Sequence, residues 1–184
     1  MAAGGSDAGE SDAAAGAVAA FGDLYRDLAP ALRGFIRRQV PDEQVEDVLS
    51  EVFLVVWRRW AELPEPDRVR PWVYGVARNK IRQAHTQRGR VALGTELVAA
   101  DAFVHAPDPA DAQAADDRAR RLVALLPEAE ADAMTLTVWG GLTSTEAARE
   151  LGCSVTAVTS RLSRARTRLA AALQDELDRE RGAR

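Results

Sequence analysis

The chain has 184 residues, of which 47% are hydrophobic and 28% charged, and its formal net charge is −4. This length suits one ordinary domain or two small ones, and this composition is typical of a folded chain. The single cysteine, Cys153, excludes an internal disulfide framework and fits a reducing compartment. No apolar run approaches the roughly 18 to 20 residues that a membrane-spanning helix needs, so no membrane contact is expected.

The charges are distributed unevenly along the chain. Seven basic residues and no acid lie between Arg68 and Gly94, and four arginines and no acid lie between Leu151 and Gln174. These two segments carry +11, so the rest of the chain carries −15. Two basic segments in an acidic chain predict two localised contacts with a polyanion, although two solvated helix faces are the simpler alternative. The overall acidity predicts weak binding to free DNA.

The N-terminal residues 1–16 are rich in alanine, glycine, serine and aspartate and contain no lysine or arginine. This composition predicts a disordered tail and excludes a signal peptide. Apolar residues at helical spacing then predict a first helix from about Ala17, with a kink or break at Pro30. Asp42, which follows a proline, is the expected N-cap of a second helix.

The second helix has the clearest pattern in the chain. One apolar stripe predicts its buried side, and the opposite face is polar and either solvated or bound to a partner. A proline-containing loop follows, and a third, strongly basic helix is expected from about Arg70, with Pro71 in its first turn. The apolar stripe of the second helix consists of Val45, Val48, Leu49, Val52, Phe53, Val56, Trp57 and Trp60.

Residues 91–109 are rich in alanine, aspartate and proline and predict a flexible linker. Helical spacing resumes at residue 110, is interrupted at Pro127, and continues from Glu128 to Trp139, where Gly140 and Gly141 end it. The absence of alternating strand patterns predicts an all-α fold of two small helical domains, residues 17–90 and 110–174, with a C-terminal tail of residues 175–184.

The segment GLTSTEAARELGCSVTAVTSRLSRAR predicts a helix-turn-helix. Thr143 and Glu146 have the spacing of a capping box, Gly152 permits a left-handed turn, and Ser154 caps the second helix. Such a helix enters the DNA major groove with its first residues on base edges, while arginines hold the phosphates. A plain helical hairpin is the alternative. The second helix is expected to bury Val155, Val158, Leu162, Ala165 and Leu169.

No pattern in the sequence predicts catalysis. Cys153, His85 and His105 lie in unrelated segments without metal-ligand spacing, and there is no glycine-rich phosphate loop. The chain is therefore expected to be no enzyme and to bind neither a metal nor a cofactor.

Three motifs together resemble the bacterial sigma factors of the extracytoplasmic-function (ECF) group, over roughly residues 18–172. The helix-turn-helix resembles sigma region 4, the segment DVLSEVFLVVWRRW resembles region 2.2, and RPWVYGVARNKIRQAHTQRGR resembles regions 2.3 and 2.4. The resemblance implies a cytoplasmic protein that binds core RNA polymerase, through its β′ clamp and β subunits, and promoter DNA. It also implies control by an anti-sigma factor.

The resemblance assigns roles to three groups of residues. Asp47, Ser50, Glu51, Phe53 and Trp57 would contact the polymerase. Arg70, Trp72, Tyr74, Arg78, Asn79, Lys80 and Arg82 would serve the melted −10 element, with Trp72 and Tyr74 supporting the helix from inside and Asn79 lining a base pocket together with the loop 63–69. Thr143, Ser154, Thr156, Ala157, Thr159, Ser160, Arg161 and Arg164 would contact the −35 element.

The sequence departs from the family pattern at two places. Ser50 stands where region 2.2 commonly has glutamine, and residues 156–159 replace a Gly-Thr-Val-Lys run, which predicts an altered −35 preference. Two rival hypotheses remain. One is a stand-alone LuxR-like helix-turn-helix regulator, and the other is a degenerate module that binds polymerase without contacting DNA. The linker leaves the relative placement of the two domains open.

Overall fold

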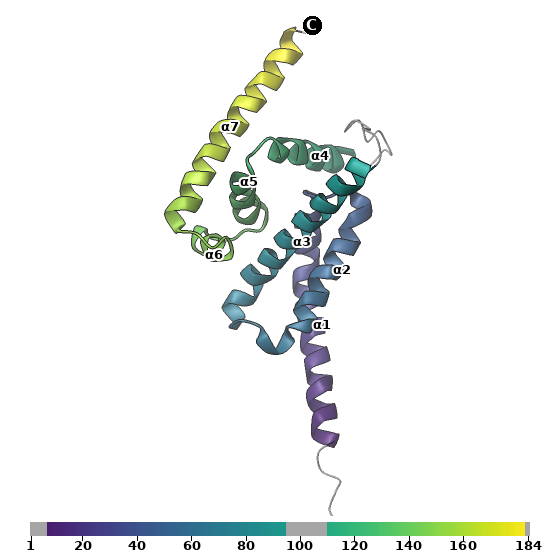
Figure 1. The fold of residues 1–184 in the computed structure, drawn as a ribbon. Helices are drawn as coiled ribbons and strands as arrows, with labels where there is room; N and C mark the ends of the chain where they lie inside the picture. Colours follow the sequence, from purple (N-terminus) through teal and green to yellow (C-terminus); the bar gives the residue numbers. More distant parts are fainter. Residues whose placement is uncertain (1–6, 95–109, 183–184) are drawn as a thin grey trace, which may run out of the picture.

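The computed structural model describes residues 7–94 and 110–182, which form helices and turns with no strand among them (Figure 1). The predicted all-α fold of two helical domains is confirmed. Helices α1 to α3 form the first domain, and α4 to α7 form the second (Figure 1). Most of the predicted linker lies outside the described residues.

Helix α1 spans Asp7–Arg37, so the predicted break at Pro30 is absent, whereas a kink there stays a prediction. The helix begins inside the expected disordered tail, where its alanines have the highest helix propensity. Pro30 lies within the helix on its exposed side, while Ala29 and Leu32 beside it are buried. Tertiary packing of this buried face stabilises the helix across the proline.

Helix α2 spans Asp42–Arg58 and is capped by Pro41, so Asp42 is a first-turn residue and not the expected N-cap. Its carboxylate still lies at the positive end of the helix dipole. After a short 3-10 turn, η1 (Trp60–Glu62), helix α3 spans Pro66–Gly94. It starts earlier than predicted because Pro66 and not Pro71 occupies the first turn, so only residues 63–65 remain as a loop.

The core of the first domain is formed by the predicted apolar stripe of α2 between α1 and α3. The fully buried side chains include Phe35 and Ile36 of α1, Val52 of α2 and Val73 of α3. Burial of each such side chain contributes about 1.5 to 3 kcal/mol. One side of α3 therefore packs in this core. The rest of its surface faces outward or toward the second domain.

The second domain consists of α4 (Ala110–Ala124), α5 (Glu128–Met134), a π-helical turn η2 (Thr135–Trp139), α6 (Ser144–Glu150) and α7 (Val155–Gly182). Ala147 and Ala148 of α6 pack with Val158 and Leu162 of α7, as the helix-turn-helix pattern predicts. One expectation is wrong, because Val155 is exposed. Helix α7 continues to Gly182, within the segment predicted as the C-terminal tail.

The two domains contact each other, with α6 packed on α3 (Figure 1). The buried residues of both form one continuous cluster. Tyr74 of α3 joins them, because its ring packs edge-on against Phe35, with centroids 5.0 Å apart, and also lies against Gly140. A Cβ at Gly140 would come within 3.0 Å of Tyr74 Cδ1 and 2.6 Å of the Leu136 carbonyl oxygen. Glycine at this position therefore allows the close approach of the domains.

Candidate functional site

The exposed face of α2 combines acids with two large apolar side chains. Asp47, Ser50, Glu51, Leu54 and Trp57 follow one another at helical spacing and are all exposed. Leu54 is 45% and Trp57 42% exposed, which is unusual for residues of this size. A face of this kind fits a protein partner, because apolar anchors beside charged groups give both affinity and specificity.

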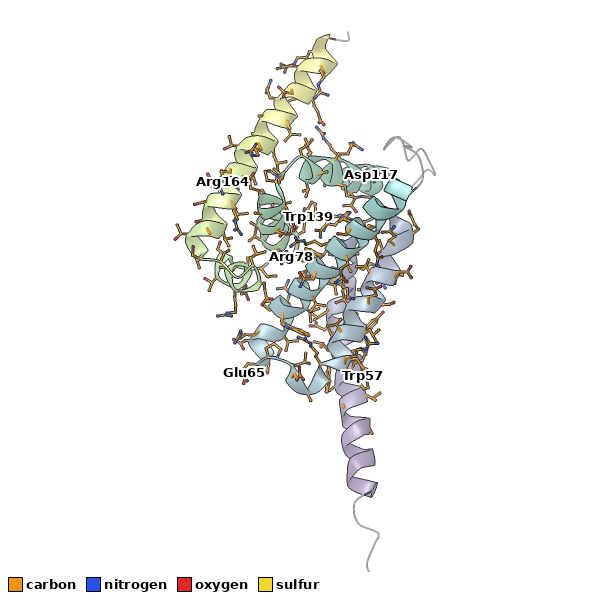
Figure 2. The ribbon with its side chains drawn as sticks, viewed as in Figure 1. Trp57, Glu65, Arg78, Asp117, Trp139 and Arg164 are labelled. Atoms are coloured by element: carbon orange, nitrogen blue, oxygen red, sulfur yellow. The ribbon has the colours of Figure 1, made fainter. Side chains whose placement is uncertain are left out.

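Two of the expected polymerase contacts, Phe53 and Trp57, differ from each other in exposure. Phe53 is only 4% exposed and packs against Tyr25, with ring centroids 4.5 Å apart, so the expectation that it lies on the docking face is wrong. Trp57 lies at the surface (Figure 2), where it packs edge-on against Phe21, with centroids 5.1 Å apart. Phe53 thus supports the face from inside, and Trp57 is available to a partner.

Leu54 is a candidate contact that the sequence analysis missed. It falls outside the buried stripe of α2, on the same face as Glu51 and Trp57. An apolar residue on the polar face of a clearly amphipathic helix was the signal that could have identified it.

The expected −10 residues of α3 do not form one exposed surface. Tyr74 is buried, as expected of a supporting residue, and Trp72 is half-buried. Arg70 donates a hydrogen bond of 3.0 Å to the Gly140 carbonyl oxygen and stacks over the Tyr74 ring at 5.4 Å. Arg78 forms an ion pair with Asp132, with 2.8 Å between Nη2 and Oδ2. Arg70 and Arg78 are thus both engaged by the second domain.

Lys80 and Asn79 occupy different sides of α3. Lys80 Nζ lies 3.0 Å from Glu51 Oε2, so this lysine joins α3 to the docking face of α2. Asn79 is exposed and lines a surface hollow with Arg82, Gln83 and other residues of α3.

The loop before α3 does not share a pocket with Asn79 in this structure. The hollow beside Asn79 is lined by α3 alone. At a rise of about 1.5 Å per residue, Pro66 and Asn79 lie about 20 Å apart along the helix. In Figure 2, Glu65 lies near one end of α3 and Arg78 farther along the helix. This hollow is therefore not a common pocket of the loop and Asn79, and the common base pocket stays a prediction.

The helix-turn-helix has the predicted caps and turn. The Thr143 hydroxyl accepts a 3.2 Å hydrogen bond from the Glu146 backbone N–H, and the Glu146 carboxylate accepts one of 2.7 Å from the Thr143 N–H. The Thr143 hydroxyl also lies 2.7 Å from Glu146 Oε2, and donation from this hydroxyl and from the Thr143 N–H to the carboxylate holds the pKa of Glu146 below its usual value. Gly152 has φ +60°, and Ser154 Oγ accepts from the Ala157 N–H at 3.1 Å. This geometry fixes the start of α7 as a rigid element.

The outer face of α7 presents hydroxyl groups and arginines. Thr156, Thr159 and Ser160 are exposed, whereas Ala157 is half-buried. Arg161 is held against the turn, with Nη1 3.4 Å from Cys153 Sγ. Small hydroxyl side chains at the first turns of a helix are suited to contact base edges or phosphates.

Glu130 of α5 is a buried carboxylate that fixes two arginines of α7. It is 5% exposed, and its Oε1 accepts a 3.2 Å hydrogen bond from Arg164 Nε. Arg168 Nε lies 3.1 Å from Oε2, at ion-pair distance but without hydrogen-bond alignment. Sequence analysis did not identify Glu130, because nothing in a short acidic helix marks one acid as buried. Its position orients Arg164, an expected −35 contact (Figure 2).

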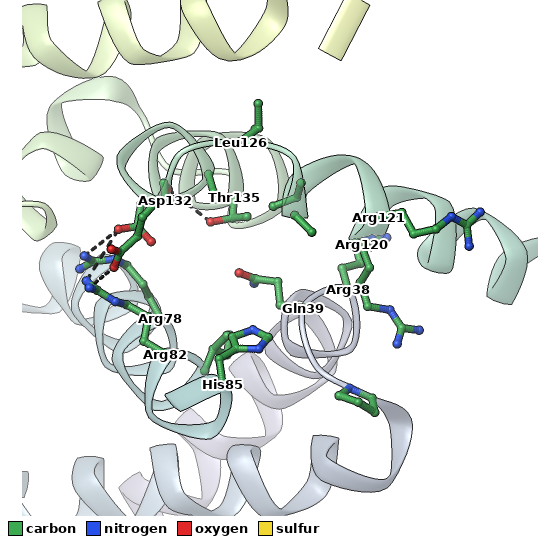
Figure 3. A pocket seen from close by; sticks show the side chains of 16 residues that line it. Arg38, Gln39, Arg78, Arg82, His85, Arg120, Arg121, Leu126, Asp132 and Thr135 are labelled. Atoms are coloured by element: carbon green, nitrogen blue, oxygen red, sulfur yellow. Dashed lines mark hydrogen bonds and ion pairs between the residues drawn. The ribbon is translucent and has the colours of Figure 1, made fainter. Parts of the chain in front are cut away.

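A cavity of about 650 Å³ lies between the domains, with an apolar floor and arginines at its edge (Figure 3). Ile81 and Leu126 contribute to the floor, and Arg38, Arg78 and Arg120 to the edge. At one end, the Asp132 carboxylate points at Arg78 and Arg82 (Figure 3).

Residues 7–94 and 110–182 contain no group of three or more histidines, cysteines or acids placed to hold a metal ion. Within the same ranges, no helix has the length and apolar character to cross a membrane.

Comparisons with known proteins cover both domains. The model of the family "Sigma-70 region 2" matches residues 24–91, and that of "Sigma-70, region 4" matches residues 116–169. The RNA polymerase sigma factor NccH of Alcaligenes xylosoxydans xylosoxydans is 31% identical over 172 residues, which cover 88% of this chain and 91% of that protein. The ECF RNA polymerase sigma factor RpoE of Cereibacter sphaeroides is 30% identical over 155 residues, 82% of this chain and 84% of that protein.

Solved structures agree with these relatives. The structure of CnrH in complex with the cytosolic domain of CnrY has a TM-score of 0.69 at 29% identity, covering 90% of this chain and 94% of that chain. The sigma factor RpoE from Bartonella quintana, solved with the anti-sigma factor NepR, shares the fold with a TM-score of 0.64 at 23% identity, over 83% of this chain and 97% of that chain. Since both regions match in order and relatives about 30% identical extend along most of the chain, this protein belongs to the ECF group of the sigma-70 family of RNA polymerase sigma factors.

Proposed function

We propose that this sigma factor docks on core RNA polymerase through the α2 face formed by Asp47, Ser50, Glu51, Leu54 and Trp57. The observation that carries this proposal is the exposure of Leu54 and Trp57 beside acids on an otherwise well-packed helix. Leu54 and Trp57 are apolar and have acids beside them. They favour a partner surface that is apolar at its centre and basic at its rim.

In the same proposal, α3 and α7 contact the promoter. Arg78, Asn79 and Arg82 hold the melted −10 strand, because a positive helix with polar side chains can follow a single-strand backbone. Thr156, Thr159, Ser160, Arg161 and Arg164 contact the −35 element in the major groove. The chain acts in the cytoplasm without catalysis of its own, since the polymerase performs the nucleotidyl transfer.

An anti-sigma factor is the proposed regulator. The CnrH and Bartonella quintana RpoE structures each contain a sigma factor bound to a second protein, CnrY and the anti-sigma factor NepR respectively. The cavity between the domains is lined by apolar residues and has arginines at its edge. Such a surface suits an acidic amphipathic segment of a partner protein.

The test is transcription by sigma-free core polymerase on fragmented DNA from the source genome, with and without this protein. Discrete new start sites are expected, and alignment of the upstream sequences would give both promoter elements. Polymerase binding without new starts would favour the degenerate module. Absence of both would contradict the proposed function.

A double variant tests DNA contact by α7 separately. Arg161→Ala with Arg164→Ala is expected to abolish most promoter-dependent starts while polymerase binding persists. The control is Arg179→Ala with Arg181→Ala, which removes the same charge at the far end of the same helix. Equal transcription by the two double variants would show that α7 does not contact the promoter through these arginines.

A further inference from the structure

The cavity between the domains has the size and the lining of a small-molecule site. Its volume is about 650 Å³, within the roughly 300 to 1,000 Å³ that is typical of ligand pockets. Ile81, Val123, Leu126 and Ala131 line it, so apolar side chains from both domains meet there. The polymerase and promoter contacts proposed above use none of these four residues.

The charged part of the lining is mainly basic. Its members are Arg38, Arg78, Arg82, Arg120, Arg121, Glu128 and Asp132. Five arginines and two acids give a net charge of +3, in a chain whose formal net charge is −4. Arg38 and Arg120 lie at one end of the cavity, and Asp132 lies at the other end beside Arg78 (Figure 3). An anionic group therefore fits the end at Arg38 and Arg120 and is disfavoured beside Asp132.

Two arginines of the lining have a buried donor without an acceptor. The Nε atoms of Arg78 and Arg120 are buried and have no hydrogen-bond partner, a state that only one other side-chain atom of the described residues shares. Arg120 Nη2 lies 2.5 Å from Asp117 Oδ1, so an ion pair holds this guanidinium without satisfying its Nε. Because buried donors in proteins are nearly always paired, this lining points to a missing acceptor.

The acids that pair with Arg38 and Arg120 leave both arginines able to hold a further anion. Asp116 accepts a 3.1 Å hydrogen bond from Arg38 Nε, and neither Asp116 nor Asp117 lines the cavity. A guanidinium has five N–H donors, so each of these arginines has donors beyond those that its own acid uses. A carboxylate between the two arginines would accept from both of them.

The lining disfavours the other common classes of ligand. A cation would meet a net positive charge, and a neutral apolar molecule would leave Arg120 Nε unpaired. A nucleotide base needs a stacking surface, and no Phe, Tyr or Trp is among the described residues that line the cavity. The class that fits is a molecule with one anionic head and a hydrocarbon body.

We propose that this cavity binds a small anionic amphiphile, a carboxylate with a hydrocarbon chain, whose head accepts hydrogen bonds from Arg38 and Arg120 and whose chain lies against Ile81 and Leu126. The inference goes beyond the proposed function and does not depend on it. The acidic amphipathic segment proposed for an anti-sigma factor has the same chemistry, so segment and amphiphile would compete for one cavity.

The first test measures binding of decanoate to the full-length chain by isothermal titration calorimetry at neutral pH. Two control ligands separate the head from the chain: decyltrimethylammonium has the same chain with a cationic head, and acetate has the head without the chain. Saturable binding of decanoate is expected, with no detectable binding of either control. Absence of decanoate binding would overturn the inference. Equal binding of the decyl cation would also overturn it, because this would show adsorption to apolar surface without recognition of the head.

Two pairs of variants locate the site. Arg120→Gln removes a head contact, and its control, Arg118→Gln, removes a half-exposed arginine of the same helix that lies outside the lining. Ala131→Phe fills the cavity, and its control, Ala170→Phe, places the same ring at an exposed position of α7. Arg120→Gln is expected to weaken decanoate binding about ten-fold and Ala131→Phe to abolish it, while both controls bind like the wild type.

Melting temperatures show whether each variant is folded, because both substitutions lie where the domains meet. Decanoate is expected to raise the melting temperature of the wild type and of both controls, but not that of Ala131→Phe. Wild-type affinity for decanoate in Arg120→Gln or in Ala131→Phe would overturn the inference. A chain that binds decanoate as expected but starts no transcript with core polymerase would instead contradict the proposed function alone.

Discussion

In this sigma factor, the partners of a side chain and not its residue type decide whether it is buried or exposed. Glu130 and Glu128 are two residues apart in one short helix, yet Glu130 is buried with arginines of α7 while Glu128 is exposed and faces α3. Burial of the Glu130 carboxylate without its arginines would lower the stability of the fold. The position of this acid therefore depends on Arg164 and Arg168.

Glu130→Gln is expected to lower the free energy of unfolding. The loss should be about 1 kcal/mol, at the low end for charged hydrogen bonds, because both arginine partners remain more than half exposed. Urea unfolding followed by circular dichroism measures it. Asp178→Asn, at an exposed pair, is the control, and an equal loss in both variants would contradict a special role for Glu130.

The capping box predicts both a stability loss and its pH dependence. Thr143→Ala is expected to cost about 1 kcal/mol at neutral pH, while Thr143→Ser keeps the cap. Because the pKa of Glu146 is lowered in the folded chain, its contribution is present above the ordinary carboxyl pKa and is lost as pH falls through the lowered value. The stability difference between wild type and Thr143→Ala should therefore shrink in acid to the part that comes from the bond between the Thr143 hydroxyl and the Glu146 N–H. A constant difference down to low pH would show that Glu146 takes no part.

Glu150 is expected to have the opposite pH dependence. Burial raises its pKa, while Arg68, Arg149 and Arg78 partly oppose the shift. A raised folded-state pKa means that stability present at low pH is lost as pH rises through that value. Glu150→Gln should therefore match the wild type in acid and have a higher melting temperature at neutral pH, as thermal unfolding from pH 4 to 8 would test. A lower melting temperature at neutral pH would indicate that the arginines outweigh burial.

Among the helices, α2 has two faces with separate tasks. Its buried stripe holds α1 and α3 together, and its exposed face leaves Leu54 and Trp57 uncovered. Leu54 lies outside the buried core, so it can be changed to test this face independently of folding, whereas Trp57 also packs against Phe21.

Leu54→Ser is expected to weaken binding to core polymerase by about ten-fold to a hundred-fold, the equivalent of burying one leucine side chain at the interface. The melting temperature should hardly change, since Leu54 has no role in the core. Leu177→Ser, which alters a comparably exposed leucine of α7 in the other domain, is the control. Unchanged affinity in Leu54→Ser would remove Leu54 from the docking face.

At the scale of the whole molecule, the two domains are held together by ion pairs as well as by apolar packing. Helix α5 engages arginines of both α3 and α7. Several modest ion pairs and one shared apolar cluster make a contact that salt can weaken.

Local patterns determined much of this protein by themselves. The 3.6-residue periodicity gave the helices, the Thr143–Glu146 spacing gave the cap, and Gly152 gave the turn, because each depends only on neighbours along the chain. Helix ends were less well predicted. Packing carries α1 through Pro30, and α3 begins at Pro66 before the predicted start.

Tertiary structure alone decided which expected site residues are exposed and which are buried or paired. Phe53 is buried and Leu54 is exposed, Lys80 faces Glu51, and Arg78 is paired with Asp132. None of these outcomes follows from spacing within one helix, because each depends on a partner from a segment folded against it. The sequence thus determined two basic helices in an acidic chain. The fold decided that these helices are held by the chain's own acids, since only packing brings charges from distant segments within ion-pair distance.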